Sequence, residues 1–414
     1  MNFRQAEDYL LGLELFGMRF GLDRMHRLMT VLDLPQRRYG HVHVVGSNGK
    51  SSTARFCAAI LRRHGLRTGS YTSPHLGSFR ERVEVGEKPL TEAEFAAAVS
   101  AAADAAELVN RRREPDDGVT QFEALTAAAF VALARGGVEA AVIEAGLGGR
   151  YDATNVIPSK VSVVTSVGLE HTRWLGPTVA AIAEEKLAVL QPGSTLVVAP
   201  ALHPDARAVA EHAAERAGSR LVVARGDLGV RLRAPGGFQR ANFALAAAAA
   251  EAFLGEPVEH GVLERAAADT RIPGRLDVIS DDPLTVLDGA HNPEGAEALA
   301  ASLTDVLAER RPRVAVIGVL DDKDAAGMLA TLLPHFDSAV FTRPGNPRAL
   351  PPATLATLEE KVGGPPAEIV PEPRAALARA RELAGTGGAV VATGSIYLIA
   401  DLVRADPRAR VSTL

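Results

Sequence analysis

The chain has 414 residues, of which 47% are hydrophobic and 23% are charged. This is the composition of a folded globular protein rather than a disordered one, and the length exceeds what one hydrophobic core usually supports, so two domains are expected. The net charge of -5 argues against a nucleic-acid binder, and the single cysteine, Cys57, excludes an intramolecular disulfide.

The first ten residues carry Arg4, Glu7 and Asp8 where a secretory signal would need an apolar core. The Ala-rich stretch 241–254 contains Asn242 and Glu251 and is shorter than the ~18 apolar residues that indicate a membrane span. We therefore expect a cytoplasmic protein that binds neither a membrane nor nucleic acid.

In the first part of the chain, short apolar runs alternate with amphipathic stretches, a pattern typical of an α/β fold with a mostly parallel sheet. Strands are predicted at residues 41–45, 140–144, 161–165 and 195–198. Helices are predicted at residues 52–64, 92–106, 121–135 and 179–190. Residues 111–118 are predicted to form an exposed loop.

The second part repeats this rhythm and predicts a smaller, doubly wound sheet. Its strands are predicted at residues 285–288, 313–319, 338–341 and 389–393, with an exposed loop at 344–352. Residues 271–284 contain Pro273, Gly274 and Pro283 without a sustained helical period, which indicates a domain junction. We expect domains at residues 1–272 and 273–414.

Residues 41–53 read as a strand, a glycine-bearing turn and a helix start, which together suit a phosphate group. Gly46 and Gly49 allow backbone N–H groups to approach phosphate oxygens, the helix adds its positive N-terminus, and Lys50 adds a mobile charge. Val44 stands where the general P-loop pattern has its first glycine. A surface turn is the alternative, and the apolar strand before the turn favours phosphate.

Phosphate chemistry needs a divalent cation, and Mg²⁺ prefers oxygen ligands at the carboxyl ends of parallel strands. Glu144 ends a predicted strand, Ser73 follows an extended segment, and His171 follows another strand. Taken one by one, the alternatives are a capping glutamate, a turn-forming serine before proline, and a structural histidine.

Taken together, these segments resemble the folylpolyglutamate synthase and dihydrofolate synthase family, a branch of the Mur ligase superfamily. The resemblance covers the whole chain, through residues 46–50, 73–76, 80–82, 122–123, 144–155, 171–172, 175–176, 185–186, 273–275, 288–292, 322–324 and 393–395. It implies a P-loop domain of the Mur ligase central type with a mostly parallel sheet, followed by a smaller Rossmann-like α/β domain.

The resemblance implies that the chain uses ATP and Mg²⁺, with two metal ions, and leaves a monovalent cation requirement open. It implies that the nucleotide is bound by Asn48, Gly49, Lys50, Ser51, Asn242, Arg275 and Asp288. It implies that the metal ligands are Ser73, Glu144, His171 and Lys186. At Ser51 the chain departs from the commoner glycine of the folate branch, so its hydroxyl is a candidate for contact with phosphate or metal.

Lys186 lies within a predicted helix, where an exposed lysine would be unremarkable, but the resemblance implies that it is carbamylated. Carbamylation replaces a cation with a carboxylate-like group that can hold a second Mg²⁺. The family's lysine usually precedes Ala-Gly, whereas this one precedes Leu187 and Ala188.

For the acceptor, the resemblance implies a pterin-bearing substrate lined by Thr120, Gln121, Phe122, Glu123, Arg150, Tyr151 and Asp152. His291 resembles a residue near the incoming glutamate, and by position it is a candidate for taking the proton of the amine. Residues 322–324 fit either a solvated loop or a contact with the site.

The sequence therefore predicts a monomeric ATP-dependent ligase that adds L-glutamate to dihydropteroate, to a reduced folate, or to both, through an acyl phosphate. One rival is a Mur-type ligase for a peptidoglycan precursor, which the absence of a UDP-binding domain before the P-loop disfavours. Another rival is a P-loop switch or hydrolase, which would not need residues 288–292 or a second α/β domain.

Overall fold

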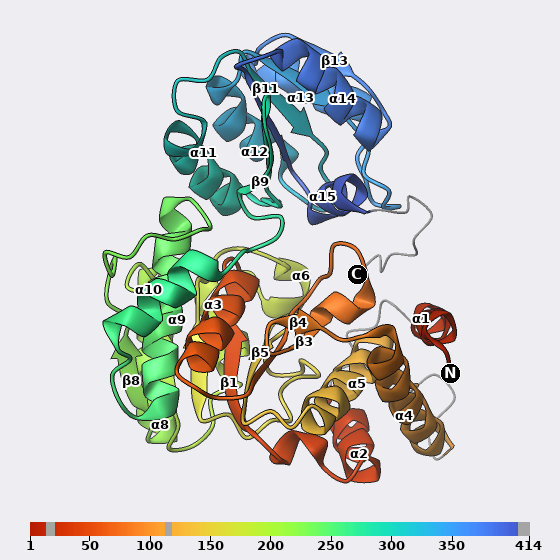
Figure 1. Ribbon diagram of the computed structural model, residues 1–414, viewed down its shortest axis with the longest axis vertical. Coiled ribbons are helices and arrows are strands. Elements are labelled where there is room, and N and C mark those ends of the chain that lie inside the picture. The colour runs from red at the N-terminus through yellow and green to blue at the C-terminus, as the bar shows by residue number, and fades with distance from the viewer. Residues whose placement is uncertain (14–20, 112–117, 405–414) are drawn as a thin grey trace. The chain divides into compact units, whose positions relative to one another are not determined.

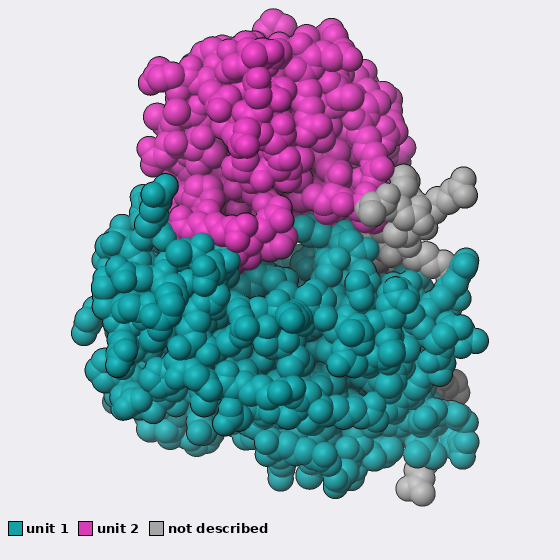
Figure 2. Space-filling view, in the orientation of Figure 1, with its two compact units in different colours: residues 1–231, 240–270, 414 teal, residues 232–239, 271–413 magenta. Residues whose placement is uncertain are grey.

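The computed structural model describes residues 1–13, 21–111 and 118–404. Two compact units are formed, one by residues 1–231 with 240–270 and the other by residues 232–239 with the chain from residue 271 on (Figure 2). The predicted loop at 111–118 falls almost wholly on residues 112–117, outside the described residues. Within the described ranges, no helix is long and apolar enough to cross a membrane.

The first unit is built on an eight-stranded sheet with the order β4-β3-β2-β5-β1-β6-β7-β8. Its strands are β1 (Gly40–Val45), β2 (Thr68–Tyr71), β3 (Val83–Val85), β4 (Lys88–Pro89), β5 (Ala140–Glu144), β6 (Val161–Val164), β7 (Thr195–Val198) and β8 (Arg220–Val223). All neighbours are parallel except the pairs that β3 makes with β2 and β4. The central strands β1, β5 and β6 are almost wholly buried, as expected for parallel strands covered on both faces.

Helices cover this sheet. They are α1 (Phe3–Gly12), α2 (Asp23–Val31), α3 (Lys50–Arg63), α4 (Glu92–Asn110), α5 (Gln121–Arg135), α6 (Thr172–Leu175), α7 (Val179–Leu187), α8 (Pro204–Ala217), α9 (Gly237–Leu254) and α10 (His260–Asp269), with short 3₁₀ turns at Pro35–Arg37 and Phe79–Arg82. Figure 1 shows α1, α2, α4 and α5 gathered on one side and α8, α9 and α10 on the other. The first group encloses one core cluster, and α7 and α8 enclose another.

The second unit has a six-stranded sheet with the order β13-β12-β11-β14-β10-β9, in which only β9 is antiparallel. Its strands are β9 (Asp277–Asp281), β10 (Leu284–Leu287), β11 (Arg313–Ile317), β12 (Ser338–Phe341), β13 (Ala367–Ile369) and β14 (Ala389–Thr393). Its helices are α11 (Pro293–Leu307), α12 (Ala325–Leu332), α13 (Pro352–Val362), α14 (Pro373–Ala384) and α15 (Ile396–Val403), with a 3₁₀ turn at Leu333–His335.

The predicted fold class, two α/β sheets with mostly parallel strands, is confirmed. All eight predicted strands and all four predicted helices are present, with ends shifted by a few residues. The helix predicted at 179–190 ends at Leu187, and the strand predicted at 313–319 ends at Ile317. In the first unit, β1 lies between β5 and β6, so three loops meet at the carboxyl edge of the sheet.

Candidate functional site

The phosphate loop occupies residues 46–49, between the end of β1 and the start of α3. Two of its backbone N–H groups are tied to the loop after β6, because Ser47 N donates to Ser166 O and Asn48 N donates to Ser166 Oγ. Lys50 folds back over the loop, and its Nζ donates to the carbonyl oxygens of Gly46 (2.8 Å) and Ser47 (3.2 Å). The lysine charge therefore lies beside the turn that the sequence assigned to phosphate.

Both loop glycines have a steric reason to be glycine. Their φ angles are +150° at Gly46 and +86° at Gly49, which side chains rarely adopt. A Cβ at Gly46 would lie 1.9 Å from Thr165 Oγ1, and one at Gly49 would lie 2.5 Å from Asn242 Oδ1. Asn242, the predicted adenine contact from α9, therefore packs directly against the phosphate loop. This tight cradle fits a nucleotide phosphate.

Glu144 brings two of the other predicted residues together. This side chain is buried at the end of β5, where Ser51 Oγ donates to its Oε1 (2.9 Å) and Ser73 N donates to its Oε2 (3.0 Å). A carboxylate and a hydroxyl oxygen side by side are the kind of ligands that Mg²⁺ prefers, so this donor set fits Mg²⁺.

His171 lies on the other flank of the phosphate loop, because it follows β6 whereas Glu144 ends β5. It precedes α6 with a φ of +46°, and it is exposed. The described residues hold no group of three or more His, Cys, Asp or Glu side chains spaced to bind a metal. A metal at this edge would therefore need hydroxyl groups and phosphate oxygens as well as Glu144.

Lys186 is 1% exposed, unlike the surface lysine that its helical position allowed. Its Nζ donates to Gly46 O (2.9 Å) and to Glu170 Oε1 (2.7 Å). Burial lowers the pKa of Lys186 to about 8, with Glu170 opposing the shift and Lys50 adding to it. A lysine with such a pKa is neutral in roughly a tenth of the molecules at about pH 7, far more than an ordinary lysine, and carbamylation requires the neutral amine.

Glu170 was missed as a site residue by the sequence analysis, although it stands next to His171. Burial alone would raise its pKa, but the charges of Lys186 and Lys50 outweigh burial and lower the pKa to about 2. Glu170 therefore stays ionised beside both lysines. The sequence feature that could have identified it is an acidic residue in the loop after β6, where ligands of a parallel sheet bind.

The loop after β5, residues 145–152, is fixed at both ends. Gly149 packs against the backbone of α7, where a Cβ would lie 2.6 Å from Lys186 O. Arg150 Nε donates to Glu185 Oε1 (2.8 Å), and Tyr151 is 40% exposed. Asp152 is buried and accepts from Leu147 N (2.8 Å), and burial raises the pKa of its carboxyl against the effect of these hydrogen bonds.

Three of the side chains at residues 120–123 form hydrogen bonds or ion pairs that hold the scaffold, and the fourth, Phe122, packs against the loop after β5. Thr120 and Glu123 form a capping box at the start of α5, and Glu123 is also paired with Arg24 (3.0 Å). Gln121 Nε2 donates to Leu10 O (2.8 Å). The Phe122 ring packs against Gly146, where a Cβ would lie 2.5 Å from the ring, and stacks with Tyr71. Among residues 120–123, the Phe122 side chain therefore contacts the 145–152 loop.

In the second unit, Asp288 follows β10 and accepts from Leu276 N (2.9 Å) and Ala290 N (2.8 Å). Burial raises the pKa of Asp288, and the nearby Arg275 opposes that shift. The His291 ring lies with Nδ1 2.9 Å from Gly289 O. Because a carbonyl only accepts, Nδ1 carries the proton and Nε2 is the basic nitrogen of the neutral ring.

The loop at residues 322–324, also in the second unit, is internally paired. Asp322 contacts Lys323 (3.0 Å) and Arg348 (3.6 Å), and these two cations help to lower its pKa against burial. Asp322 and Asp324 are exposed, so the choice between a solvated loop and a contact with the site stays a prediction.

Comparisons with known proteins agree with this geometry. The family model described as Mur ligase, glutamate ligase domain, matches residues 274–396. A dihydrofolate synthase/folylpolyglutamate synthase of Mycobacterium tuberculosis is 37% identical over 383 residues, which cover 83% of this chain and 78% of that protein.

Two solved structures share the whole fold. The Mycobacterium tuberculosis folylpolyglutamate synthase complexed with ADP is 32% identical, covers 96% of both chains and has a TM-score of 0.89. The E. coli FolC in complex with DHPP and ADP is 28% identical, covers 97% of both chains and has a TM-score of 0.85. These are ligand-bound forms of the proteins to which this chain is similar.

Proposed function

We infer from the family to which this chain belongs, the dihydrofolate synthase/folylpolyglutamate synthase family of ATP-dependent ligases, that it joins L-glutamate to a pteridine-bearing carboxylate. The acceptors are dihydropteroate and folates that already carry glutamate, so the enzyme is bifunctional. The observation that carries the proposal is the Glu144 carboxylate held by Ser51 Oγ and Ser73 N beside the Lys50 loop. That arrangement suits a metal-bound nucleotide.

A phosphorylated intermediate would overcome the low reactivity of a carboxylate toward an amine. A carboxylate is a poor electrophile and its negative charge repels a nucleophile, so direct amide formation in water is slow. In the proposed reaction an acceptor carboxylate oxygen attacks the γ-phosphorus of ATP, ADP leaves, and an acyl phosphate forms. The glutamate amine then attacks the acyl carbon, the C–O bond to phosphate breaks, and inorganic phosphate leaves.

The residues of the first unit act on the first step. Lys50, released from its contacts with Gly46 and Ser47, binds the oxygens of the transferred phosphoryl group and offsets the charge that develops there. Asn48, Gly49 and Ser51 hold the phosphate chain, and Asn242 orients the adenine. Ser73, Glu144 and His171 would hold one Mg²⁺ ion, which supplies charge neutralisation at the phosphate oxygens.

Lys186 would hold a second Mg²⁺ ion as a carbamate. Its burial and its lowered pKa support this role, because a neutral amine reacts with carbon dioxide and a buried carbamate is protected from solvent. Glu170 and Gly46 O keep the Nζ atom at the phosphate loop.

The acceptor and the glutamate are assigned to separate groups of residues. Phe122 and residues 150–152 line the pteridine end of the acceptor, and Arg275 and Asp288 reach the nucleotide. His291 Nε2 takes the proton that the glutamate amine loses on attack, since Nδ1 is already engaged with Gly289 O.

A phosphate-release assay tests the function. The chain is incubated with ATP and Mg²⁺, and with dihydropteroate or tetrahydrofolate, each with and without L-glutamate. We expect release that depends on both the acceptor and glutamate. Turnover that ignores glutamate would favour a nucleotide hydrolase and overturn the proposal.

The proposal also places the enzyme in the cytoplasm as a monomer. ATP use and a single buried cysteine support the compartment. Size-exclusion chromatography with light scattering at working concentration tests the monomer.

A further inference from the structure

A buried chain of hydrogen bonds links β1 to the loop after β5. It begins at His43, which is fully buried in the middle of β1, three residues before the phosphate-loop Gly46. His43 Nε2 lies 2.8 Å from Thr154 Oγ1, and Thr154 Oγ1 in turn bonds Asp152 Oδ1. Thr154 is 0% exposed and Asp152 is 6% exposed, so no step of the chain is at the surface.

The direction of the donors in this chain follows from counting protons. Asp152 Oδ1 already accepts from Thr154 N (3.0 Å), and Oδ2 accepts from Leu147 N (2.8 Å), so the carboxylate acts as the acceptor throughout. The single hydroxyl proton of Thr154 goes to Asp152, and the Thr154 oxygen therefore accepts from His43. This fixes the proton of His43 on Nε2.

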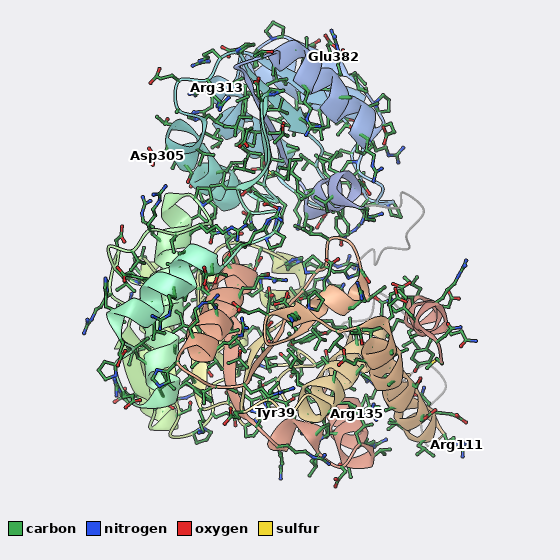
Figure 3. The ribbon with its side chains drawn as sticks, in the orientation of Figure 1. Tyr39, Arg111, Arg135, Asp305, Arg313 and Glu382 are labelled. Carbon is green, nitrogen blue, oxygen red and sulfur yellow. The ribbon has the colours of Figure 1, made fainter. Side chains whose placement is uncertain are left out.

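The His43 ring has the properties that this arrangement needs. Burial, with His41 adding to the effect, lowers its pKa to about 3, so the ring is neutral and carries one proton. Its other nitrogen, Nδ1, is buried and has no hydrogen-bond partner among residues 1–13, 21–111 and 118–404. A buried polar atom left unpaired costs free energy, so the histidine is poorly explained by packing alone. The next histidine along β1 toward its start, His41, packs its ring at a tilt against Tyr39, which is labelled in Figure 3.

The far end of the chain lies where the acceptor is assigned. Asp152 holds the backbone of the loop through Leu147, and that loop packs against the Phe122 ring at Gly146. Burial is the main reason why the pKa of Tyr71 is raised to about 12, and the negative charge of Asp152 adds to it. Asp152 bonds Leu147, which is next to the Gly146 that packs on Phe122, and Phe122 stacks with Tyr71.

We propose that His43 and Thr154 are positioning residues for the acceptor, because their hydrogen-bond chain fixes Asp152 and thereby the loop 146–152 that contacts the pteridine. This inference rests on the proposed function, since it assumes that the loop 146–152 contacts the acceptor. Neither residue touches the substrate. A buried chain of hydrogen bonds of this kind favours one geometry, and losing one member loosens the rest.

Paired substitutions at Thr154 provide the test. Thr154→Val keeps the shape of the side chain and removes the hydroxyl, and Thr154→Ser keeps the hydroxyl. Thr270→Val is the matched control, because the Thr270 hydroxyl is buried and has no hydrogen-bond partner in the described part of the chain. The KM for the pteridine acceptor and the KM for ATP are measured for each variant and for the wild type.

We expect Thr154→Val to raise the acceptor KM about tenfold and to leave the ATP KM within about twofold, whereas Thr154→Ser and Thr270→Val stay within about twofold for both. His43→Leu should match Thr154→Val, His43→Gln should restore part of the loss, and the double variant should be no worse than either single one. An unchanged acceptor KM in Thr154→Val, equal rises in both KM values, or a Thr154→Ser variant as impaired as Thr154→Val would overturn the inference.

A spectroscopic measurement keeps the inference testable if Thr154→Val does not fold. The ¹⁵N chemical shifts of the wild-type His43 ring should show a protonated Nε2 and an unprotonated Nδ1, and the reverse pattern would overturn the proposed hydrogen-bond chain.

The proposed function and the positioning role can be contradicted independently of each other. Wild-type protein that releases no phosphate with any pteridine acceptor removes the function, whereas normal wild-type turnover with an unaffected Thr154→Val variant removes only the positioning role.

Discussion

The N-termini of α3 and α5 both carry residues that the sequence assigned to the site, but the two helix ends are capped differently. At the start of α3, the helix cap is Gly49, which has no side chain with which to bond the first-turn N–H groups. At the start of α5, Thr120 and Glu123 cap the helix reciprocally, and Glu123 is also paired with Arg24. Because open N–H groups at a helix start bind anions, the first start is available to a ligand, whereas the second is occupied by its own fold.

The comparison separates ligand-binding polar groups from those that stabilise the scaffold. Lys50 donates to carbonyl oxygens of its own loop, and Glu144 accepts from the Ser51 hydroxyl and the Ser73 backbone N–H at the carboxyl edge of the sheet. Gln121 and Glu123 bond distant segments, the ends of α1 and α2. Substitutions in the two regions should therefore damage different properties of the enzyme.

The largest effect is expected from Lys50→Ala. Removing the charge that faces the transferred phosphoryl group should lower kcat by about a thousandfold or more, while the melting temperature stays close to that of the wild type. A phosphate-release assay measures kcat, and thermal unfolding measures the melting temperature. The control is Lys88→Ala, since Lys88 lies exposed on β4. Near-normal turnover in Lys50→Ala would remove its assigned role.

Replacing each of the two buried glutamates, Glu144 and Glu123, by glutamine should affect different properties: turnover in the first case and stability in the second. Glu144→Gln should lower turnover about a hundredfold at saturating ATP with a small change in stability, because it removes a proposed metal ligand. Glu123→Gln should lower the free energy of unfolding by about 3 kcal/mol, because it leaves Arg24 buried without its ionised partner. Denaturant unfolding and phosphate release are compared for both. A catalytic defect without destabilisation in Glu123→Gln would contradict the contrast.

Lys186 should form a carbamate in a pH-dependent way. Its pKa is lowered to about 8, so the neutral, reactive fraction rises from roughly a tenth at about pH 7 to roughly nine tenths at about pH 9. With ¹³C-labelled bicarbonate, the carbamate signal should grow over that range in the wild type. Lys186→Ala serves as the blank and should also lose activity. A signal of equal size in that variant would assign the carbamate elsewhere.

The smallest effect is expected at Ser51. Its hydroxyl bonds Glu144 Oε1, and a Ser51→Ala variant should need roughly three- to tenfold more Mg²⁺ for half-maximal activity and for Mn²⁺ binding measured with a non-hydrolysable ATP analogue. Ser51→Thr keeps a hydroxyl and should stay close to the wild type. Equal metal affinity in all three proteins would show that the Ser51 hydroxyl does not contribute to metal binding.

Much of the fold was predictable because the central strands are continuous apolar runs. Strands β5, β7, β12 and β14 match the predicted ranges, whereas β2, β3, β4, β8, β9 and β13 were not predicted. Strands β4, β8, β9 and β13 are short and largely exposed, so alternation and apolarity are weak there. Strands β2 and β3 are buried, but β2 is a run of mostly small polar residues and β3 has only three residues.

The site was predictable where adjacent residues carry the chemistry and not where distant partners decide it. Lys50 and Ser51 follow from a turn at a strand end, but the partners of Gln121 and Glu123 are 111 and 99 residues away. Contacts at such separations leave no local pattern. The same reason hid the link from His43 to Thr154, which are also 111 residues apart.

The central claim, that an acceptor carboxylate is activated as an acyl phosphate, is tested most directly by following oxygen. The acceptor is prepared with ¹⁸O in the reacting carboxylate and turned over with ATP, Mg²⁺ and L-glutamate, and the released phosphate is analysed by mass. We predict one ¹⁸O atom in the phosphate for each amide bond formed. Phosphate that carries oxygen from water and none from the carboxylate would contradict the mechanism.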